Sequence, residues 1–353
     1  MTKESIRKIL SEFNLNGSSL QWTPLTSGLI NDTYLVTEDD DQQYILQKIN
    51  TQVFKNAGIL MDNIQFALPA LKADYYSQIT FLNTIAGTNH LILEDDFWRM
   101  MTYIPNSTTY NTTTETSTAF EAGRIIGKFH QLLQYSDTAL FNDTLPKFHN
   151  LAFRTLEFQE ALQNADTQKI EIADGAIKKA QSLLKELQYL NTSNLPTRIC
   201  HNDTKLNNIL FSKSTKKALC LIDLDTIMKG YFFYDFGDAI RTVVNNAPED
   251  EQNHELINFD ESLFKAFVDG LAVNSSFLTT EDKDSLPLGA VFMPFIHGLR
   301  ALTDYLNNNK YFKVMYENQN LDRCLSLFDF AEKALTKKDF MAACIKKQLI
   351  YSE

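Results

Sequence analysis

The sequence predicts an α+β fold of two lobes, a small β-sheet lobe followed by a larger, mostly helical lobe. Three observations predict it: most β-rich segments lie before residue 105, helical periodicity dominates after residue 118, and a polar Thr/Asn-rich run separates the two regions. At 353 residues, the chain is long enough for each lobe to have its own core. We therefore place the lobes at 1–105 and 106–353.

The small lobe is expected to begin with a helix and to continue as a sheet. The charged, amphipathic residues 1–15 indicate a first helix rather than a signal peptide. Apolar residues at helical spacing predict a second helix over 60–78. β-rich segments bounded by acidic turns predict strands at 34–36, 44–49, 91–93 and 98–104.

The large lobe is expected to be helical apart from one short β pair. The pair lies at 209–211 and 218–222. Apolar periodicity predicts helices at 119–135, 154–164, 169–190, 260–274, 287–307 and 323–350.

The composition of the chain excludes some classes of binding partner. The net charge of −11 argues against nucleic acid, and no apolar run approaches the roughly 18 residues of a membrane span. The four cysteines form no C-x-x-C pair and have no His at metal-site spacing, so buried reduced thiols are expected. We therefore expect a cytoplasmic monomer or homodimer that uses small molecules.

One motif carries the chemistry. Asp203 lies in an H-x-D-x-x-x-x-N run that ends at Asn208, and a β pair then leads to the I-D-x-D run with Asp223 and Asp225. Phosphoryl transfer needs one carboxylate to orient a hydroxyl, and an amide and a carboxylate to hold Mg²⁺ on ATP. Asp203 is therefore the predicted base, and Asn208 and Asp223 are predicted metal ligands. Asp225 is expected on the same side as Asp223, as a further ligand or a supporting residue.

The tripeptide Asp235-Phe236-Gly237 spells the metal-binding motif of protein kinases. It follows the I-D-x-D segment, so we assign the metal role to Asp223. Asp235 is expected to cap the next helix and to support the catalytic loop.

The nucleotide side has fewer signals. The turn before the second strand offers Gly28, where a protein-kinase phosphate loop has several glycines, and Asn31 and Thr33 follow it. At the V-A-I-K position the chain has Gln47 instead of Lys. Lys48 is adjacent, but strand alternation sends it to the opposite face. The helix that should supply a Glu partner has Gln65 in a plausible place.

These segments, with Gly298-Leu299-Arg300 and Asp304-Tyr305-Leu306, resemble the aminoglycoside phosphotransferase/choline kinase superfamily, and within it the bacterial N-acetylhexosamine 1-kinases. The resemblance implies a bilobal protein-kinase-like fold and transfer from ATP, with Mg²⁺, to the anomeric hydroxyl of N-acetylglucosamine or N-acetylgalactosamine. It implies roles for three groups of residues. Gly28, Asn31, Thr33, Gln47 and the hinge Thr102-Tyr103-Ile104 bind nucleotide; Asp203 is the base; Arg300, Tyr305 and Tyr311 contact the sugar. Leu29 replaces a His of the family.

Several alternatives remain open at this point. Arg300 could instead pair with Asp304 one helical turn on, and the two tyrosines could be core residues. The acceptor could be another hexose, an amino alcohol or an aminoglycoside, although no dense acidic cluster marks a site for a cationic drug. A binding-only pseudokinase is a third reading, supported by Gly28 and Gln47 and opposed by the intact Asp203, Asn208 and Asp223.

Overall fold

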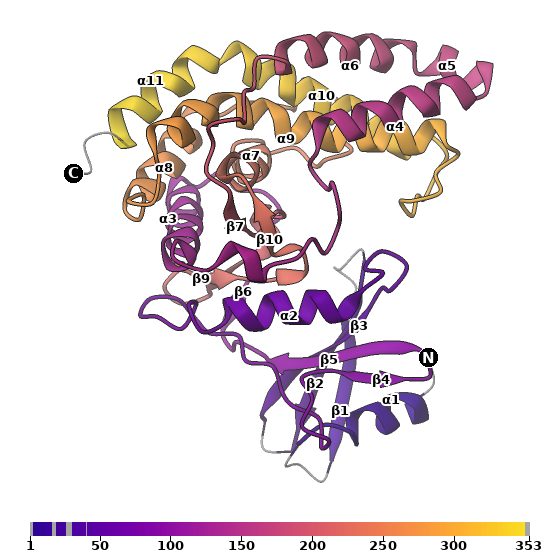
Figure 1. The fold of residues 1–353 in the computed structure, drawn as a ribbon, viewed down its shortest axis with the longest axis vertical. Helices are drawn as coiled ribbons and strands as arrows, with labels where there is room; N and C mark the ends of the chain where they lie inside the picture. The colour runs from indigo at the N-terminus through magenta and orange to yellow at the C-terminus, as the bar shows by residue number, and fades with distance from the viewer. Residues whose placement is uncertain (1–2, 16–18, 26–29, 40, 350–353) are drawn as a thin grey trace.

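A computed structural model describes residues 3–15, 19–25, 30–39 and 41–349, and it has two parts (Figure 1). A small antiparallel sheet forms the first part, and helices form most of the second. The predicted α+β fold class is confirmed. The lobe boundary at 105/106 stays a prediction.

The small sheet has five strands in the order β1-β2-β3-β5-β4. The strands are β1 Leu20–Leu25, β2 Asp32–Glu38, β3 Gln43–Ile49, β4 Leu91–Leu93 and β5 Asp96–Thr102. Helix α1 (Lys3–Leu10) covers one face, where Ile6 and Ile9 pack with Val36, Leu46 and Trp98. The hairpin and strand pairs predicted for this region are confirmed.

Helix α2 (Ala57–Ala67) lies between the sheet and the helical part (Figure 1). Asn56 caps its start by accepting a hydrogen bond from the Ile59 N–H. The helix ends earlier than the predicted residue 78, because Pro69 follows its C-cap and has no backbone N–H to continue the helical hydrogen bonds. Its apolar side chains, including Leu60 and Ile64, belong to the large core of the helical part.

The helical part contains nine α-helices within the described ranges: α3 Thr116–Leu133, α4 Leu151–Asn164, α5 Thr167–Ile172, α6 Asp174–Leu187, α7 Phe232–Val243, α8 Glu261–Ala272, α9 Thr280–Leu306, α10 Gln319–Thr336 and α11 Lys338–Leu349. Two predicted helices are each split in two, at Ala173 and at Lys337. Helix α9 starts earlier than predicted, because Thr279 and Asp282 form a capping box. Helix α7 was expected only as the helix that Asp235 would cap, and it begins before that residue, at Phe232.

Helix α9 is long and apolar enough, by composition, to cross a membrane, but 78% of its most apolar window is buried inside the protein. It is the central core helix of the helical part. All four cysteines are free and buried, as predicted.

Five short strands complete the second part: β6 Ser107–Thr108, β7 Arg198–Cys200, β8 Ile209–Ser212, β9 Ala218–Leu221 and β10 Met228–Gly230. The predicted pair β8–β9 is confirmed. Strands β7 and β10 pair antiparallel, with Met228 opposite Cys200. This pairing brings together the chain before Asp203 and the chain after Asp225.

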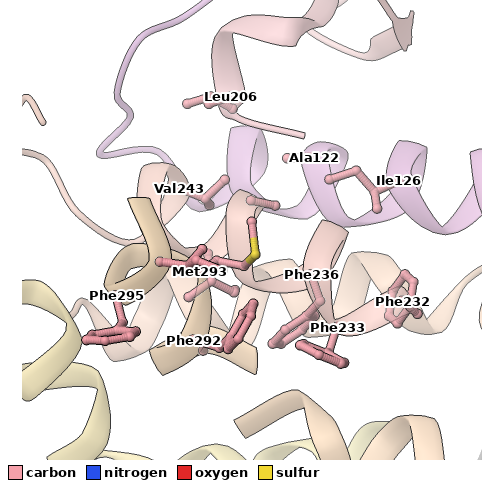
Figure 2. Close-up of a cluster of buried hydrophobic side chains, with 14 of the residues drawn as sticks. Ala122, Ile126, Leu206, Phe232, Phe233, Phe236, Val243, Phe292, Met293 and Phe295 are labelled. Carbon is pink, nitrogen blue, oxygen red and sulfur yellow. The ribbon is translucent and has the colours of Figure 1, made fainter. Parts of the chain in front are cut away.

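Helices α7 and α9 pack closely through aromatic side chains, of which Phe233 and Phe292 lie side by side in Figure 2. The close approach requires glycine at Gly237, where a Cβ atom would lie 2.1 Å from the carbonyl oxygen of Gly289. Gly237 therefore serves helix packing, and it lies two residues after Asp235.

Gly237→Ala should destabilise the protein, because the two backbones must separate to admit the methyl group. We expect a loss of about 1–3 kcal/mol or more in the free energy of unfolding, measured by urea titration. Gly175→Ala is the matched control: Gly175 is also helical, and a Cβ there meets nothing within 4 Å. The control should be neutral or slightly stabilising. Equal stability of the two variants would contradict this role.

Candidate active site

The loop with Asp203 is held by a carboxylate from α7. Asp235 accepts hydrogen bonds from the backbone N–H groups of His201 (2.8 Å) and Asn202 (2.7 Å). The ring of His130, from α3, also bonds this carboxylate at 2.8 Å, and all these groups are buried. The predicted support of the loop by Asp235 is confirmed. The predicted capping role is wrong, because Tyr231 occupies the N-cap and Asp235 bonds the loop instead.

Asp203 and Asn208 are brought together on this loop. The Asn208 Nδ2 donates to the backbone oxygen and to Oδ2 of Asp203, both at 2.8 Å. Lys205 Nζ lies 3.0 Å from the same Oδ2. The Oδ1 atoms of both residues accept no hydrogen bond from the described part of the chain. One carboxylate oxygen and one amide oxygen are thus left for ligands.

Asp223 lies in the left-handed backbone region (φ 62°, ψ 55°), which Asp tolerates better than most residues. Its side chain is exposed and accepts no hydrogen bond within the ranges that the structure describes. The surrounding protein, followed by the carboxylates of Asp225 and Asp203, raises the pKa of Asp223 to about 6. Carboxylates that repel one another in this way favour the binding of a cation between them.

Asp225 is engaged with the small sheet. Arg99 Nη2, from β5, lies 2.5 Å from Asp225 Oδ1, and Asn31 Nδ2 donates to Oδ2 at 2.7 Å. Gln47 accepts from Nε (3.0 Å) and Nη2 (2.7 Å) of Arg99, and its own amide donates to Thr33 at 3.2 Å. Both Asp225 oxygens therefore have partners in the sheet.

Helix α2 contacts the catalytic segments through an amide. The Asn63 Nδ2 donates to the carbonyl oxygens of Ile227 (2.8 Å) and Asn142 (2.7 Å), and its Oδ1 accepts from the Asn142 N–H at 3.1 Å. Gln65, which the sequence placed as the partner of residue 47, is exposed and bonds Asn89 instead.

The predicted hinge lies where β5 leaves the sheet. Thr102 and Tyr103 donate their N–H groups to Thr80 and Gln43. The Ile104 carbonyl accepts from Ser107 Oγ at 2.6 Å. The Ile104 N–H has no partner within the described ranges. Gly28 and Leu29 lie outside the described residues.

Arg300, on α9, is packed against aromatic rings. Its guanidinium carbon lies 4.7 Å from the ring centre of Phe148 and 5.8 Å from those of Tyr311 and Phe312. The chain links this cluster to the loop, because His149, next to Phe148, bonds the Asn202 carbonyl at 3.1 Å. Burial, and then the charge of a nearby arginine, lowers the pKa of Arg300 to about 10.

The alternative pairing of Arg300 with Asp304 does not occur. Asp304 accepts from the N–H groups of Tyr311 (2.8 Å) and Phe312 (2.9 Å). No carboxylate lies within ion-pair distance of Arg300 among the residues described. Tyr305 is 1% exposed and lies under Lys169 in the core, whereas Tyr311 is 52% exposed.

Sequence reasoning missed several of these residues. Arg99 had a signal, since a single charge stands in the apolar run of β5 between Trp98 and Met100. Asn63, His130 and His149 had none, because their partners come from segments distant in sequence.

The bilobal fold and this loop define a kinase-type phosphotransferase for small hydroxyl acceptors. Residues 21–268 match the phosphotransferase enzyme family, and the chain belongs to it. Similar solved structures include a microcompartment-associated aminopropanol kinase (16% identity, all of both chains, TM-score 0.63). Others are an amicoumacin kinase in complex with AMP-PNP and Ca²⁺ (13%, 94% of both chains, 0.62) and a choline kinase from Cryptosporidium parvum Iowa II (13%, 99% of both chains, 0.58). At these identities the likeness shows the fold alone.

Proposed function

We propose that the protein transfers the γ-phosphoryl group of ATP, with Mg²⁺, to the anomeric hydroxyl of N-acetylglucosamine or N-acetylgalactosamine, giving the α-1-phosphate. Asp203 is the base in this proposal, and Asn208 and Asp223 are the metal ligands. The choice of a sugar as the acceptor is supported by the contacts of Arg300.

The residues fit a magnesium nucleotide. Asp223 and the Oδ1 of Asn208 offer the hard oxygen ligands that Mg²⁺ prefers. The pKa of Asp223 is raised first by desolvation and then by repulsion from neighbouring carboxylates, and a divalent cation would relieve that repulsion. Asp225 is already bonded to Arg99 and Asn31, so its proposed role is to hold the sheet beside this site. Mg²⁺ supplies neutralisation of the charge on the phosphates.

In the proposed reaction, the free Oδ1 of Asp203 accepts the proton of the anomeric hydroxyl. The sugar oxygen forms a bond to the γ-phosphorus while the bond from that phosphorus to the β,γ-bridging oxygen breaks, and ADP leaves. Asn208 and Lys205 fix the other carboxylate oxygen of Asp203, which holds the base in position. The Ile104 N–H and the Thr102 carbonyl are the proposed contacts of adenine, with Tyr103 between them.

One observation carries the choice of acceptor: Arg300 presents a cation to the proposed acceptor side, and no carboxylate among the described residues is paired with it. An ammonium-bearing acceptor would meet repulsion there, and its binding normally requires carboxylates or open aromatic faces. The faces of Phe148 and Tyr311 are instead in contact with Arg300. A neutral sugar offers hydroxyl and acetamide oxygens, which a guanidinium can bind.

An acceptor screen tests the proposal. With ATP and Mg²⁺, N-acetylhexosamines should be phosphorylated with a kcat/KM about 100-fold above that of choline, 1-amino-2-propanol and kanamycin. The product should lose its phosphate in mild acid, as anomeric phosphates do, unlike a 6-phosphate. Faster transfer to an amino alcohol or an aminoglycoside, or no transfer to either N-acetylhexosamine, would refute the proposed acceptor. No transfer to any acceptor would support the pseudokinase reading.

Arg300→Met keeps much of the packing against the rings and removes the donors. We expect the KM for the sugar to rise about 10- to 100-fold, while the KM for ATP stays unchanged. Lys178→Met, which removes an exposed ion pair with Asp174, is the control and should change neither constant. An unchanged sugar KM in Arg300→Met would show that Arg300 does not contact the acceptor.

A further inference from the structure

The small sheet lacks a lysine at the position where kinases place a cation on the nucleotide phosphates. Gln47 stands there and is neutral. The neighbouring Lys48 does not replace it, because its Nζ lies 2.6 Å from Asp96 and beside the ring of Trp98. If the site binds a nucleotide as proposed above, the positive charge must come from another strand.

Arg99 has the position for this role. In the antiparallel pair β3–β5 it lies directly opposite Gln47, so the two side chains share one face of the sheet and their contact is made by two hydrogen bonds. The same guanidinium reaches Asp225, two residues after Asp223. The charge of Arg99 thus lies between the sheet and the metal-ligand candidates.

The hydrogen bonds of Arg99 are incomplete. Its Nε and Nη2 bond Gln47 and Asp225, but Nη1 is buried and has no acceptor within the ranges that the structure describes. The residue is 1% exposed, and an unpartnered buried guanidinium nitrogen is costly. A phosphate oxygen is the kind of acceptor that guanidinium groups bind best.

We propose that Arg99, held by Gln47 and Asp225, binds the polyphosphate of the nucleotide in place of a lysine on β3. The inference rests on the proposed nucleotide-binding function but not on the identity of the acceptor. Asp225 is a positioning residue in this scheme: its carboxylate fixes the guanidinium and is not itself a metal ligand.

The test compares ligands that differ only in phosphate. Calorimetry on the full chain should show that Arg99→Gln weakens binding of Mg·ADP about 10- to 100-fold and leaves adenosine binding unchanged. Lys48→Gln is the matched control, since it removes a cation from the next residue on the opposite face, and it should bind both ligands as wild type does. Equal weakening of ADP and adenosine, or no weakening of ADP, would overturn the proposal.

A charge swap provides the second arm. Gln47→Lys combined with Arg99→Gln returns a cation to the same face from β3, so it should recover most of the ADP affinity that Arg99→Gln loses. A purely structural role of Arg99 predicts no recovery. If Arg99→Gln does not fold, Arg99→Met removes the charge with a side chain of similar reach and should still show a loss confined to ADP; unchanged ADP binding in that variant would overturn the proposal. Failure of the proposed function is a separate result, in which wild type binds no Mg·ADP.

Discussion

Asp203→Asn should abolish turnover and leave nucleotide binding intact. Asparagine keeps the size of the side chain but cannot take the proton of the attacking hydroxyl, and a positioned base contributes about 10²–10⁴-fold. The expected kcat is therefore at least about 100-fold below wild type, measured with N-acetylglucosamine and saturating Mg·ATP. Affinity for Mg·ADP, measured by calorimetry, should stay within about threefold of wild type.

The control for this variant is Asp284→Asn, an exposed acid in the first half of α9 outside the site. It should show wild-type turnover. If Asp203→Asn retained more than about a tenth of the rate, a barrier change below about 1.4 kcal/mol, Asp203 would not be the base.

Asp223→Asn should remove the metal dependence of nucleotide binding. Wild type should bind ADP more tightly with Mg²⁺ than without it, whereas the variant should show equal affinities, and turnover should fall by about 10³-fold or more. ADP binding without metal should be retained, because Arg99 is intact in this variant. A variant that keeps the Mg²⁺ effect would place the metal on other ligands.

The pKa of Asp223 also predicts how the affinity for Mg·ADP depends on pH. Mg²⁺ needs the ionised carboxylate, so affinity for Mg·ADP should be constant above about pH 7 and fall as the pH drops through about 6. The effect on stability has the opposite sign. Because the folded-state pKa is raised, the ionised group lowers the stability of the metal-free protein above that pH. Exposure to solvent limits this cost to below about 1 kcal/mol, so the melting temperature of metal-free Asp223→Asn should not be lower than that of wild type.

Local sequence patterns predicted the parts of the fold that depend on local rules. The strands around residues 34–49 and the pair β8–β9 follow alternation and turn chemistry, and these are confirmed. Breaks within helices were harder to predict, because the apolar periodicity continues across Ala173 and Lys337, where the helices end. Helix α7 was expected only through the capping role given to Asp235, and its bounds were not predicted, because the aromatic and acidic run that forms it is buried on nearly every side, which hides its periodicity.

The residues of the candidate site also divide into those that local sequence patterns predict and those that they do not. Asp203, Asn208 and Asp223 could be proposed from spacing, because they come from one short stretch of chain, and their roles stay predictions. The partners that hold them were not, because Arg99 and Asn63 are far away in sequence and meet the catalytic segments only through tertiary packing. Their roles depend on register and helix placement, which no local pattern encodes.

The attachment of α2 has a consequence for regulation. In protein kinases, activity is controlled by moving the corresponding helix relative to the catalytic loop. Here Leu60 and Ile64 of α2 are buried in the large core, and Asn63 fastens the helix to the backbone at Ile227 and Asn142. An outward movement of this helix would expose that core to solvent and break the three hydrogen bonds of Asn63. The packing and hydrogen bonds of α2 therefore oppose the helix movement by which signalling kinases are switched on and off.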